Sequence, residues 1–477
     1  MTSRTPAFLA FFALATTTAS AFVLPACSGA SSSSLVGGKG DGGSGSSSSG
    51  GSSGGSSGGS SGGSSGGSSG GGSSGGSSGG SSGGSSGSSS GSGCGTKIHG
   101  TVWDPAQLKP VYNAIVYIPT VALDTIASGP SCDLCGTPPS GAPAAVAISA
   151  ADGTFTLDNT PSGTNIPIVV QIGKWRRENA RIPAVTACTD NAVDGSLTRL
   201  PKNKSEGHIP HIAISTGLDT VECALQTIGV DQAEITDNTG TGSIHLYQGS
   251  TTSGATGNTN VPATTLWGSA AILNQYDMVL DACQGLAPTD KPAASLTNIY
   301  DYAGQGGRVY MSHYENYLLW PTGSTSPWSS NAMQDTAPPT LTQENYAINV
   351  GIPKGNALAH WALTAQASTT LGNINNDTGL VWRADVTSIS PPTIGWINGV
   401  TPTNVYQMSF YAGSTSCGKV SYSDFHVSQG ATAATVFPGE CATAMPDTVA
   451  TDLFEFFLFD TMSCAMDDTM APVAPPL

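Results

Sequence analysis

Residues 306–317, GGRVYMSHYENY, contain two glycines, an apolar run and then His313, where the run ends. A continuous apolar run of this length is typical of a strand that is buried on both faces of a parallel sheet. In open parallel sheets, ligands bind beyond the carboxyl ends of the strands. The stretch therefore predicts a strand that places His313 at the ligand-binding edge of a sheet.

The sequence around this stretch alternates between helical and strand patterns. Residues 217–230, GLDTVECALQTIGV, have apolar positions at helical spacing, with Asp219 or Thr220 able to cap the helix. The pattern continues in the strand-like runs GSIHLYQG, YDMVLDACQG and GKVSYSDFHVS and in the helix candidates WGSAAILNQ, SLTNIYDYAGQ and TDLFEFFLFDTMSC. This alternation predicts an α/β domain over residues 217–465 whose parallel sheet is covered on both faces.

A long insert, residues 321–416, interrupts the pattern and is rich in Trp, Tyr, Thr and Pro. It contains one helix candidate, GNALAHWAL, and possible strands at GLVWRADV and PTIGWING. Because it is too long for a simple connection, we expect either a cap over the ligand-binding edge or an additional β-layer. Its aromatic residues offer stacking surfaces for a carbohydrate, although they serve equally well as core.

The region before the α/β domain, residues 94–185, shows short β-rich runs separated by Gly and Pro. Asp152-Gly153 lies between two such runs and predicts a hairpin, because these residues tolerate positive φ. The pattern favours a small β-sandwich, so the predicted fold class is α+β multidomain. Residues 186–216 are expected to connect the two domains, and residues 466–477 to form a tail.

The first 26 residues have a charged start and an apolar middle, as secretory signals do. The segment LPAC resembles a bacterial lipobox, which implies lipidation of Cys27; Pro25 departs from that motif, so cleavage near residues 19–21 is the alternative. The chain from residue 27 to 93 is otherwise almost entirely Gly and Ser, which predicts a disordered leash. We therefore expect an outer-membrane-anchored lipoprotein of the bacterial cell envelope, facing the periplasm or the cell surface.

The charge and the cysteines limit the partners and the compartment. The formal net charge is −16 with 16 Lys and Arg residues, which argues against nucleic acid. The ten cysteines fit an oxidising compartment, and assigning Cys27 to lipidation leaves an odd number, so at least one thiol is expected outside the disulfides. The disulfide candidates are Cys132, Cys135, Cys188, Cys223, Cys417, Cys441 and Cys464.

Cys132 and Cys135 form a C-x-x-C pair within SGPSCDLCGTPPSG. Such a pair can supply half of a zinc site, but no second C-x-x-C or H-x-x-x-H follows it. We expect disulfides instead, with Cys188 and Cys223 as plausible partners, and the sequence leaves the connectivity open.

Two parts of the chain resemble known families. The runs GTVWDP, PVYNAIVYIP and SAADGTFTLDNTPSG resemble the carboxypeptidase regulatory-like (transthyretin-like) domain, which implies an adhesive or spacer β-domain without catalysis. The YD-apolar, GGR-apolar-His and GKV strands resemble the class I glutamine amidotransferase-like fold, especially its ThuA-like branch, and imply a doubly wound, flavodoxin-like arrangement. The whole chain resembles exported lipoproteins of the myxobacterial type.

The amidotransferase resemblance bears directly on His313. In that family the corresponding strand ends in a nucleophilic cysteine on a strained turn flanked by glycines, whereas here His313 is followed by Tyr314 and Glu315. The resemblance therefore implies that glutaminase activity is absent and that the strained turn is missing.

Two groups of side chains suit a chemical function, and a structural role is the alternative for both. Cys283 with His313, and with Asp424 to orient the imidazole, satisfies the requirements for an activated nucleophile. His313, Asp424 and His426 form a two-histidine, one-carboxylate set that suits a metal. Cysteine and aspartate at strand ends also serve as packing and loop-fixing residues.

We expect a non-enzymatic binding or structural protein, with no cofactor, that recognises a carbohydrate or a peptide at the sheet edge. The ligand-contacting candidates are Gln284, His313, Tyr314 and His426. The alternative is a hydrolase that uses Cys283 and His313, or a metal bound by His313, Asp424 and His426.

Overall fold

The computed structural model describes residues 94–249, 261–338, 345–374, 384–401, 403–413, 417–427, 438–441 and 445–477. The expectations for the signal segment, Cys27 and the Gly/Ser leash lie outside these residues. Residues Cys94–Leu477 belong to one compact unit, so a division of this part into separate domains is not confirmed. Within the described ranges, every helix is too short or too polar to cross a membrane.

A ten-stranded sheet forms the centre of the C-terminal region. Its strands, in spatial order, are β10 (Ile235–Asp237), β11 (Ile244–Gln248), β9 (Ile212–Thr216), β12 (Met278–Asp281), β13 (Arg308–Ser312), β20 (Gly418–Ser423), β19 (Val405–Ala412), β18 (Ile394–Gly399), β15 (Tyr346–Ile348) and β16 (Asn373–Ile374). The first six run parallel, and the last four continue the sheet in antiparallel pairs.

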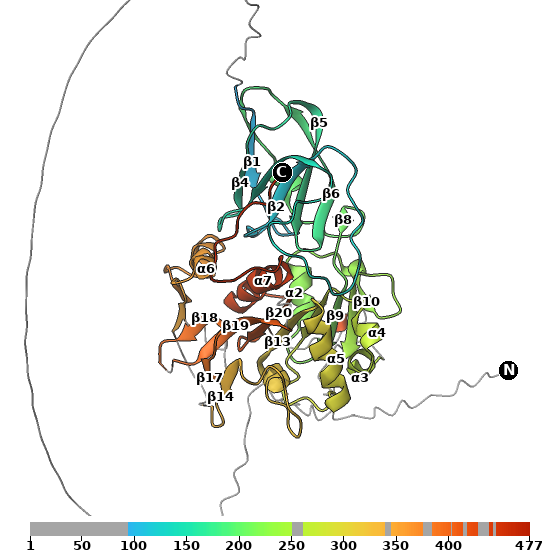
Figure 1. Cartoon of the computed structure of the whole chain (residues 1–477), viewed down its shortest axis with the longest axis vertical. Helices are drawn as coiled ribbons and strands as arrows, with labels where there is room; N and C mark the ends of the chain where they lie inside the picture. Colours follow the sequence, from blue (N-terminus) through green and yellow to red (C-terminus); the bar gives the residue numbers. More distant parts are fainter. Residues whose placement is uncertain are drawn as a thin grey trace, which may run out of the picture. The chain divides into compact units, whose positions relative to one another are not determined.

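Helices cover both faces of this sheet. Successive strand residues point to opposite sides, so each strand contributes side chains to both apolar layers. Ile212 and Ile214 of β9 pack in one apolar cluster with α2 (Val221–Thr227) and α7 (Val449–Met462). Ala213, between them, packs in a second cluster with α3 (Ala263–Trp267), α4 (Ala270–Leu273) and α5 (Ala293–Gly304). Figure 1 shows these three helices side by side. The predicted mixed α/β character is confirmed.

Two segments lie elsewhere than the sequence predicts. Strand β9 falls within residues 186–216, the expected connection, yet it lies between β11 and β12 in the parallel part of the sheet. The insert supplies α6 (Pro353–Thr364), the pair β14 (Ala332–Gln334) and β17 (Val386–Ile389), and the antiparallel strands of the large sheet. Because β19 pairs directly with β20, these strands extend the existing sheet instead of forming a cap or a separate layer.

The N-terminal region contains two further sheets. One has the strand order β3 (Pro143–Ile148), β2 (Ile115–Pro119), β5 (Gly163–Ile172), β6 (Trp175–Val185) and β8 (Gly207–His208). The other has the order β4 (Thr154–Leu157), β1 (Lys97–Thr101) and β7 (Asp190–Ala192), and the short helix α1 (Gly195–Thr198) follows it. Gly153 has the expected positive φ of 76°, but its turn joins β3 to β4 of the other sheet, so the predicted hairpin does not form.

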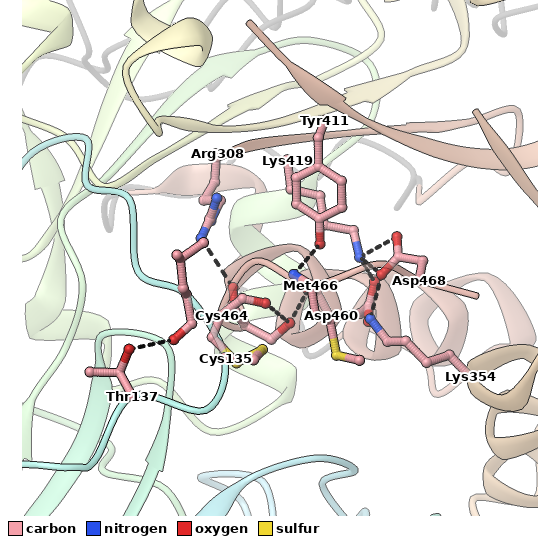
Figure 2. Close-up of a disulfide and its surroundings, with 12 residues drawn as sticks. Cys135, Thr137, Arg308, Lys354, Tyr411, Lys419, Asp460, Cys464, Met466 and Asp468 are labelled. Atoms are coloured by element: carbon pink, nitrogen blue, oxygen red, sulfur yellow. Dashed lines mark hydrogen bonds and ion pairs between the residues drawn. A yellow bond between two sulfur atoms is a disulfide. The ribbon is translucent and has the colours of Figure 1, made fainter. Parts of the chain in front are cut away.

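Disulfides connect the two regions at the C-x-x-C segment. Cys132 pairs with Cys417 at the start of β20, and Cys135 pairs with Cys464 after α7 (Figure 2). The remaining disulfides are Cys94–Cys188 and Cys223–Cys441. The expectation of disulfides is confirmed, whereas Cys188 and Cys223 are not the partners of the C-x-x-C pair, because its loop lies against the C-terminal strands and helix.

Candidate functional site

Cys283 lies just beyond the carboxyl end of β12, beside the end of β13. Its backbone N–H donates a hydrogen bond to Ser312 Oγ at 2.7 Å, and Ser312 Oγ donates to Asp219 Oδ2 at 2.8 Å. Cys283 takes part in none of the four disulfides and is buried. The loop after β9, which carries Asp219, and the ends of β12 and β13 therefore meet at the edge where a parallel sheet binds its ligands.

His313 occupies a strained turn between β13 and the 3₁₀ helix η2 (His313–Leu318). Its φ is 42°, a left-handed conformation that costs a non-glycine residue roughly 1–3 kcal/mol. The expectation that the strained turn is missing is therefore wrong: the turn forms without a glycine, and the histidine itself adopts the unfavourable backbone. Such strain at a buried imidazole is typical of a functional position.

Two imidazoles face the Cys283 thiol. Cys283 Sγ lies 3.6 Å from His313 Nδ1, and the rings of His313 and His426 are 4.4 Å apart between centroids. One ligand atom from each of these three side chains lies within 4.8 Å of the other two. All three residues are buried, with at most 5 % of their surface exposed.

A carboxylate holds each imidazole from its other side. His426 Nδ1 lies 3.0 Å from Asp219 Oδ1, and His313 Nε2 lies 3.3 Å from Asp385 Oδ2. The hydrogen bond to Asp219 places a proton on Nδ1 of His426, so in the neutral ring the lone pair lies on Nε2. The contact between His313 Nε2 and Asp385 Oδ2 has the distance of an ion pair but not the geometry of a hydrogen bond. No described residue makes a hydrogen bond of normal geometry to His426 Nε2, which is buried.

The charges at the site perturb His426 and Asp424 in the same direction. Burial lowers the pKa of His426, but the Asp219 carboxylate, helped by Cys283, outweighs burial and raises that pKa well above its ordinary value. Burial, followed by the Asp385 charge, raises the pKa of Asp424 well above its ordinary value. The surroundings therefore favour the protonated form of His426 and the neutral form of Asp424.

The other predicted residues are distributed around this centre. Asp424 accepts a hydrogen bond from Tyr422 Oη at 2.5 Å and one from the Asp385 N–H at 3.1 Å, and it groups with His313 and Asp385. The structure therefore does not bring His313, Asp424 and His426 together as a single ligand set. Tyr314 packs its ring 4.5 Å from that of His313.

Gln284 and Glu315 face a neighbouring charged cluster instead of the thiol. The Gln284 amide lies 3.4 Å from Asp290 Oδ2, and Glu315 Oε2 accepts a hydrogen bond from Lys291 Nζ at 2.9 Å. Glu315 is fully buried.

Sequence reasoning missed the two carboxylates that hold the imidazoles. The sequence marks Asp219 only as a helix cap, yet it follows β9 by three residues and its position would have been apparent had that strand been recognised. Asp385 comes from the insert, just before β17, and nothing in its local sequence signals its role.

The described tryptophans of the insert do not form an exposed platform. Trp328, Trp361 and Trp396 are each at most 4 % exposed and pack in the apolar clusters. Trp382, another insert tryptophan, lies outside the described residues. The sequence-based argument for carbohydrate stacking therefore has no support from these three side chains.

Comparisons with known proteins leave the family open. No family model and no curated protein matches the chain. Similar solved structures include the mmIFT52 N-terminal domain (TM-score 0.30, 8 % identity, covering 52 % of this chain and 96 % of that chain). Another is a protein from Thermoplasma acidophilum whose name describes it as part of a GMP synthase (TM-score 0.29, 10 % identity, covering 54 % and 94 %). Likenesses this weak say nothing about the site.

Proposed function

We propose that this chain is an exported cell-envelope lipoprotein that binds one zinc-class metal ion through Cys283, His313 and His426. In this proposal a lipid on Cys27 and the Gly/Ser leash carry a carboxypeptidase regulatory-like region followed by an amidotransferase-like α/β region. The observation that supports metal binding is that one ligand atom from each of Cys283, His313 and His426 lies within 4.8 Å of the other two in a buried site, with a carboxylate beside each imidazole.

One cation can be held by all three side chains at once. A thiolate and two neutral imidazole nitrogens can all donate to it, and metal binding displaces the protons that these groups otherwise carry. Carboxylates behind metal-bound histidines are the usual supporting contacts at such sites.

The spacing and the donor types fit zinc. Ligands about 2.3 Å (S) and 2.1 Å (N) from one tetrahedral zinc lie roughly 3.5 Å apart. The observed separation between Cys283 Sγ and His313 Nδ1 is 3.6 Å. One thiolate with two imidazoles suits Zn²⁺ or copper and is a poor match for Mg²⁺ or Ca²⁺, which prefer oxygen ligands. Three protein ligands leave one position for water or a further ligand.

A hydrolase built on the same residues has less support. Cys283, His426 and Asp219 form the sequence of nucleophile, base and orienting carboxylate that cysteine hydrolases use. However, Cys283 and His313 are both 0 % exposed, so a substrate cannot reach the thiol in this conformation. A nucleophile also needs only one imidazole, whereas this thiol faces two.

Metal analysis of the mature protein, purified without chelator and then equilibrated with Zn²⁺, tests the proposal. We expect about one zinc per chain, lost in Cys283→Ala and in His426→Ala. His360→Ala removes an exposed histidine on α6 and should retain full zinc, which controls for loss of an arbitrary histidine. If the wild-type chain takes up no zinc, or if Cys283→Ala binds it with unchanged affinity, the proposal is wrong.

A further inference from the structure

Buried lysines in this protein make two different kinds of contact with carboxylates. Lys354 Nζ donates to Asp468 Oδ1 at 2.6 Å, and Lys419 Nζ donates to Asp460 Oδ2 at 2.5 Å, in a network that Figure 2 shows beside the Cys135–Cys464 disulfide. These lysines and carboxylates satisfy one another as ordinary ion pairs. The contact between Lys109 and Asp452, at another junction of the two regions, has a different geometry.

Lys109 Nζ lies 2.5 Å from Asp452 Oδ1, but the directions at the two atoms are not those of a hydrogen bond. The hydrogen bond from Lys109 Nζ goes instead to Asp447 Oδ1, an exposed carboxylate, at 2.9 Å. The side chains of Lys109 and Asp452 are 11 % and 5 % exposed. The amine is therefore held against a buried carboxyl group without the orientation that an ion pair normally adopts.

A third acid lies on the same helix face. Glu455 follows Asp452 by three residues on α7, a spacing that places both side chains on one side of the helix. Glu455 is 2 % exposed, and no described residue makes a hydrogen bond to its Oε1. Burial, followed by the nearby charge of Asp104, raises the pKa of Glu455 well above its ordinary value, which favours its protonated form.

The surroundings are apolar. Phe456, the residue after Glu455, stacks on Tyr112 with 6.1 Å between the ring centroids, and Val111 and Leu453 belong to the same buried cluster. Burial lowers the pKa of Lys109, but Asp452 and Asp447 outweigh burial and raise that pKa, whereas burial raises the pKa of Asp452 to about 7. The amine must therefore pass its proton to the Asp452 carboxylate before it can react, and Glu455, one helical turn away, supplies a second acid.

We propose that Lys109 and Asp452 are joined by an intramolecular isopeptide bond, formed with Glu455 as the proton donor. A proton first passes from the Lys109 ammonium to the Asp452 carboxylate. Nζ then attacks Cγ of Asp452, Glu455 protonates the departing hydroxyl, and the amine returns a proton to Glu455. The C–N bond forms, one C–O bond breaks, one water molecule leaves, and no oxidant or activating reagent is needed.

The bond would connect the N-terminal region covalently to the last helix. Lys109 lies between β1 and β2, and Asp452 lies in the first turn of α7. The two disulfides of the C-x-x-C segment make a similar connection, but they depend on an oxidising environment. An amide would keep the regions joined after reduction.

Mass spectrometry of the full exported protein, reduced and digested with a protease, tests the inference. We expect a branched peptide that joins the residues around Lys109 to those around Asp452, with their summed mass lowered by one water molecule. Lys109→Arg keeps the positive charge and should give only the two linear peptides. Asp452→Asn should still form the branch but lose ammonia instead of water.

The role of Glu455 has its own measurement. Glu455→Gln keeps the shape of the side chain and removes its acid. The fraction of chains that give the branched peptide should therefore fall several-fold in Glu455→Gln, and Lys109→Arg should give no branched peptide. On a reducing denaturing gel the wild-type chain, still looped, should migrate differently from Lys109→Arg. A wild-type digest that contains only the two linear peptides overturns the inference, and a fully branched Glu455→Gln protein overturns the role of Glu455.

Discussion

His313 and His426 differ from ordinary buried histidines in that each has a carboxylate on one nitrogen and the same thiol near the other. Sequence reasoning found both histidines and Cys283, because each follows an apolar strand at the sheet edge. It did not find Asp219 or Asp385. A carboxylate that acts through another side chain leaves no mark in its own sequence, and Asp385 reaches the site only through the fold of the insert.

The carboxylate behind His426 should strengthen metal binding without being a ligand. We expect Asp219→Asn to lower zinc affinity by about 10–100-fold, because the ring loses the group that fixes its tautomer and increases its basicity. Competition with a chromophoric chelator measures the change. The matched control is Asp190→Asn, which removes the exposed carboxylate 2.7 Å from His99 and should leave zinc affinity unchanged. Equal affinities for wild type and Asp219→Asn would show that Asp219 has no such role.

At the scale of elements, the sequence predicted most helices and strands of the parallel sheet. Strands β12 and β13 and helices α2, α5 and α7 fall where the apolar periodicity places them. Strand β9 was missed because the apolar run after Pro210 is short and looks like the end of a connection. The insert was expected to form a cap or an additional β-layer, since its long-range pairing with β20 cannot be read from local periodicity.

Glu206 connects several elements of the N-terminal region, and acid should weaken them. Burial would raise the pKa of Glu206, but hydrogen bonds from Arg199 and the Lys202 N–H, with the charge of Arg177, lower that pKa from 4.5 to about 2. A lowered folded-state pKa stabilises the fold above pH 4.5, and this stability is lost as the pH falls toward 2. Because solvent reaches this side chain and screens its charge, Glu206→Gln should reduce the free energy of unfolding by roughly 1–2 kcal/mol at pH 7.

Denaturant unfolding at several pH values measures this effect. The difference between wild type and Glu206→Gln should shrink as the pH falls below 4.5. Asp158→Asn, which breaks a pair with Lys97 whose side chains are at least half exposed, should change stability by less than about 1 kcal/mol. A Glu206→Gln difference that stays constant down to pH 2 would contradict the assignment.

At the scale of the whole molecule, two disulfides hold the N-terminal region to the end of the sheet and to α7. Once Cys132–Cys417 has formed, Cys135–Cys464 closes a loop of about 50 residues instead of one that spans 329, so each disulfide contributes less while the other is present. We expect removal of one to cost about 2 kcal/mol and removal of both to cost roughly 5 kcal/mol or more.

These disulfide variants are compared in a Lys109→Arg background, so that no isopeptide bond spans the same regions. Thermal unfolding is measured for the variant without Cys132–Cys417, for the variant without Cys135–Cys464 and for the variant without both, each made by Cys→Ser substitution. These measurements give the three losses of stability. Removal of Cys94–Cys188, which lies within the N-terminal region, is the control and should add independently. Strictly additive losses at the two C-x-x-C disulfides would contradict the shared role.

Metal binding at the edge of the parallel sheet is the central claim, and anomalous X-ray diffraction tests it most directly. Crystals of the full chain, grown after equilibration with Zn²⁺, are measured on both sides of the zinc absorption edge. The account predicts one strong anomalous peak within bonding distance of Cys283 Sγ, His313 Nδ1 and His426 Nε2, and none there in Cys283→Ala crystals. An ordered site with no anomalous peak between these three side chains would contradict it.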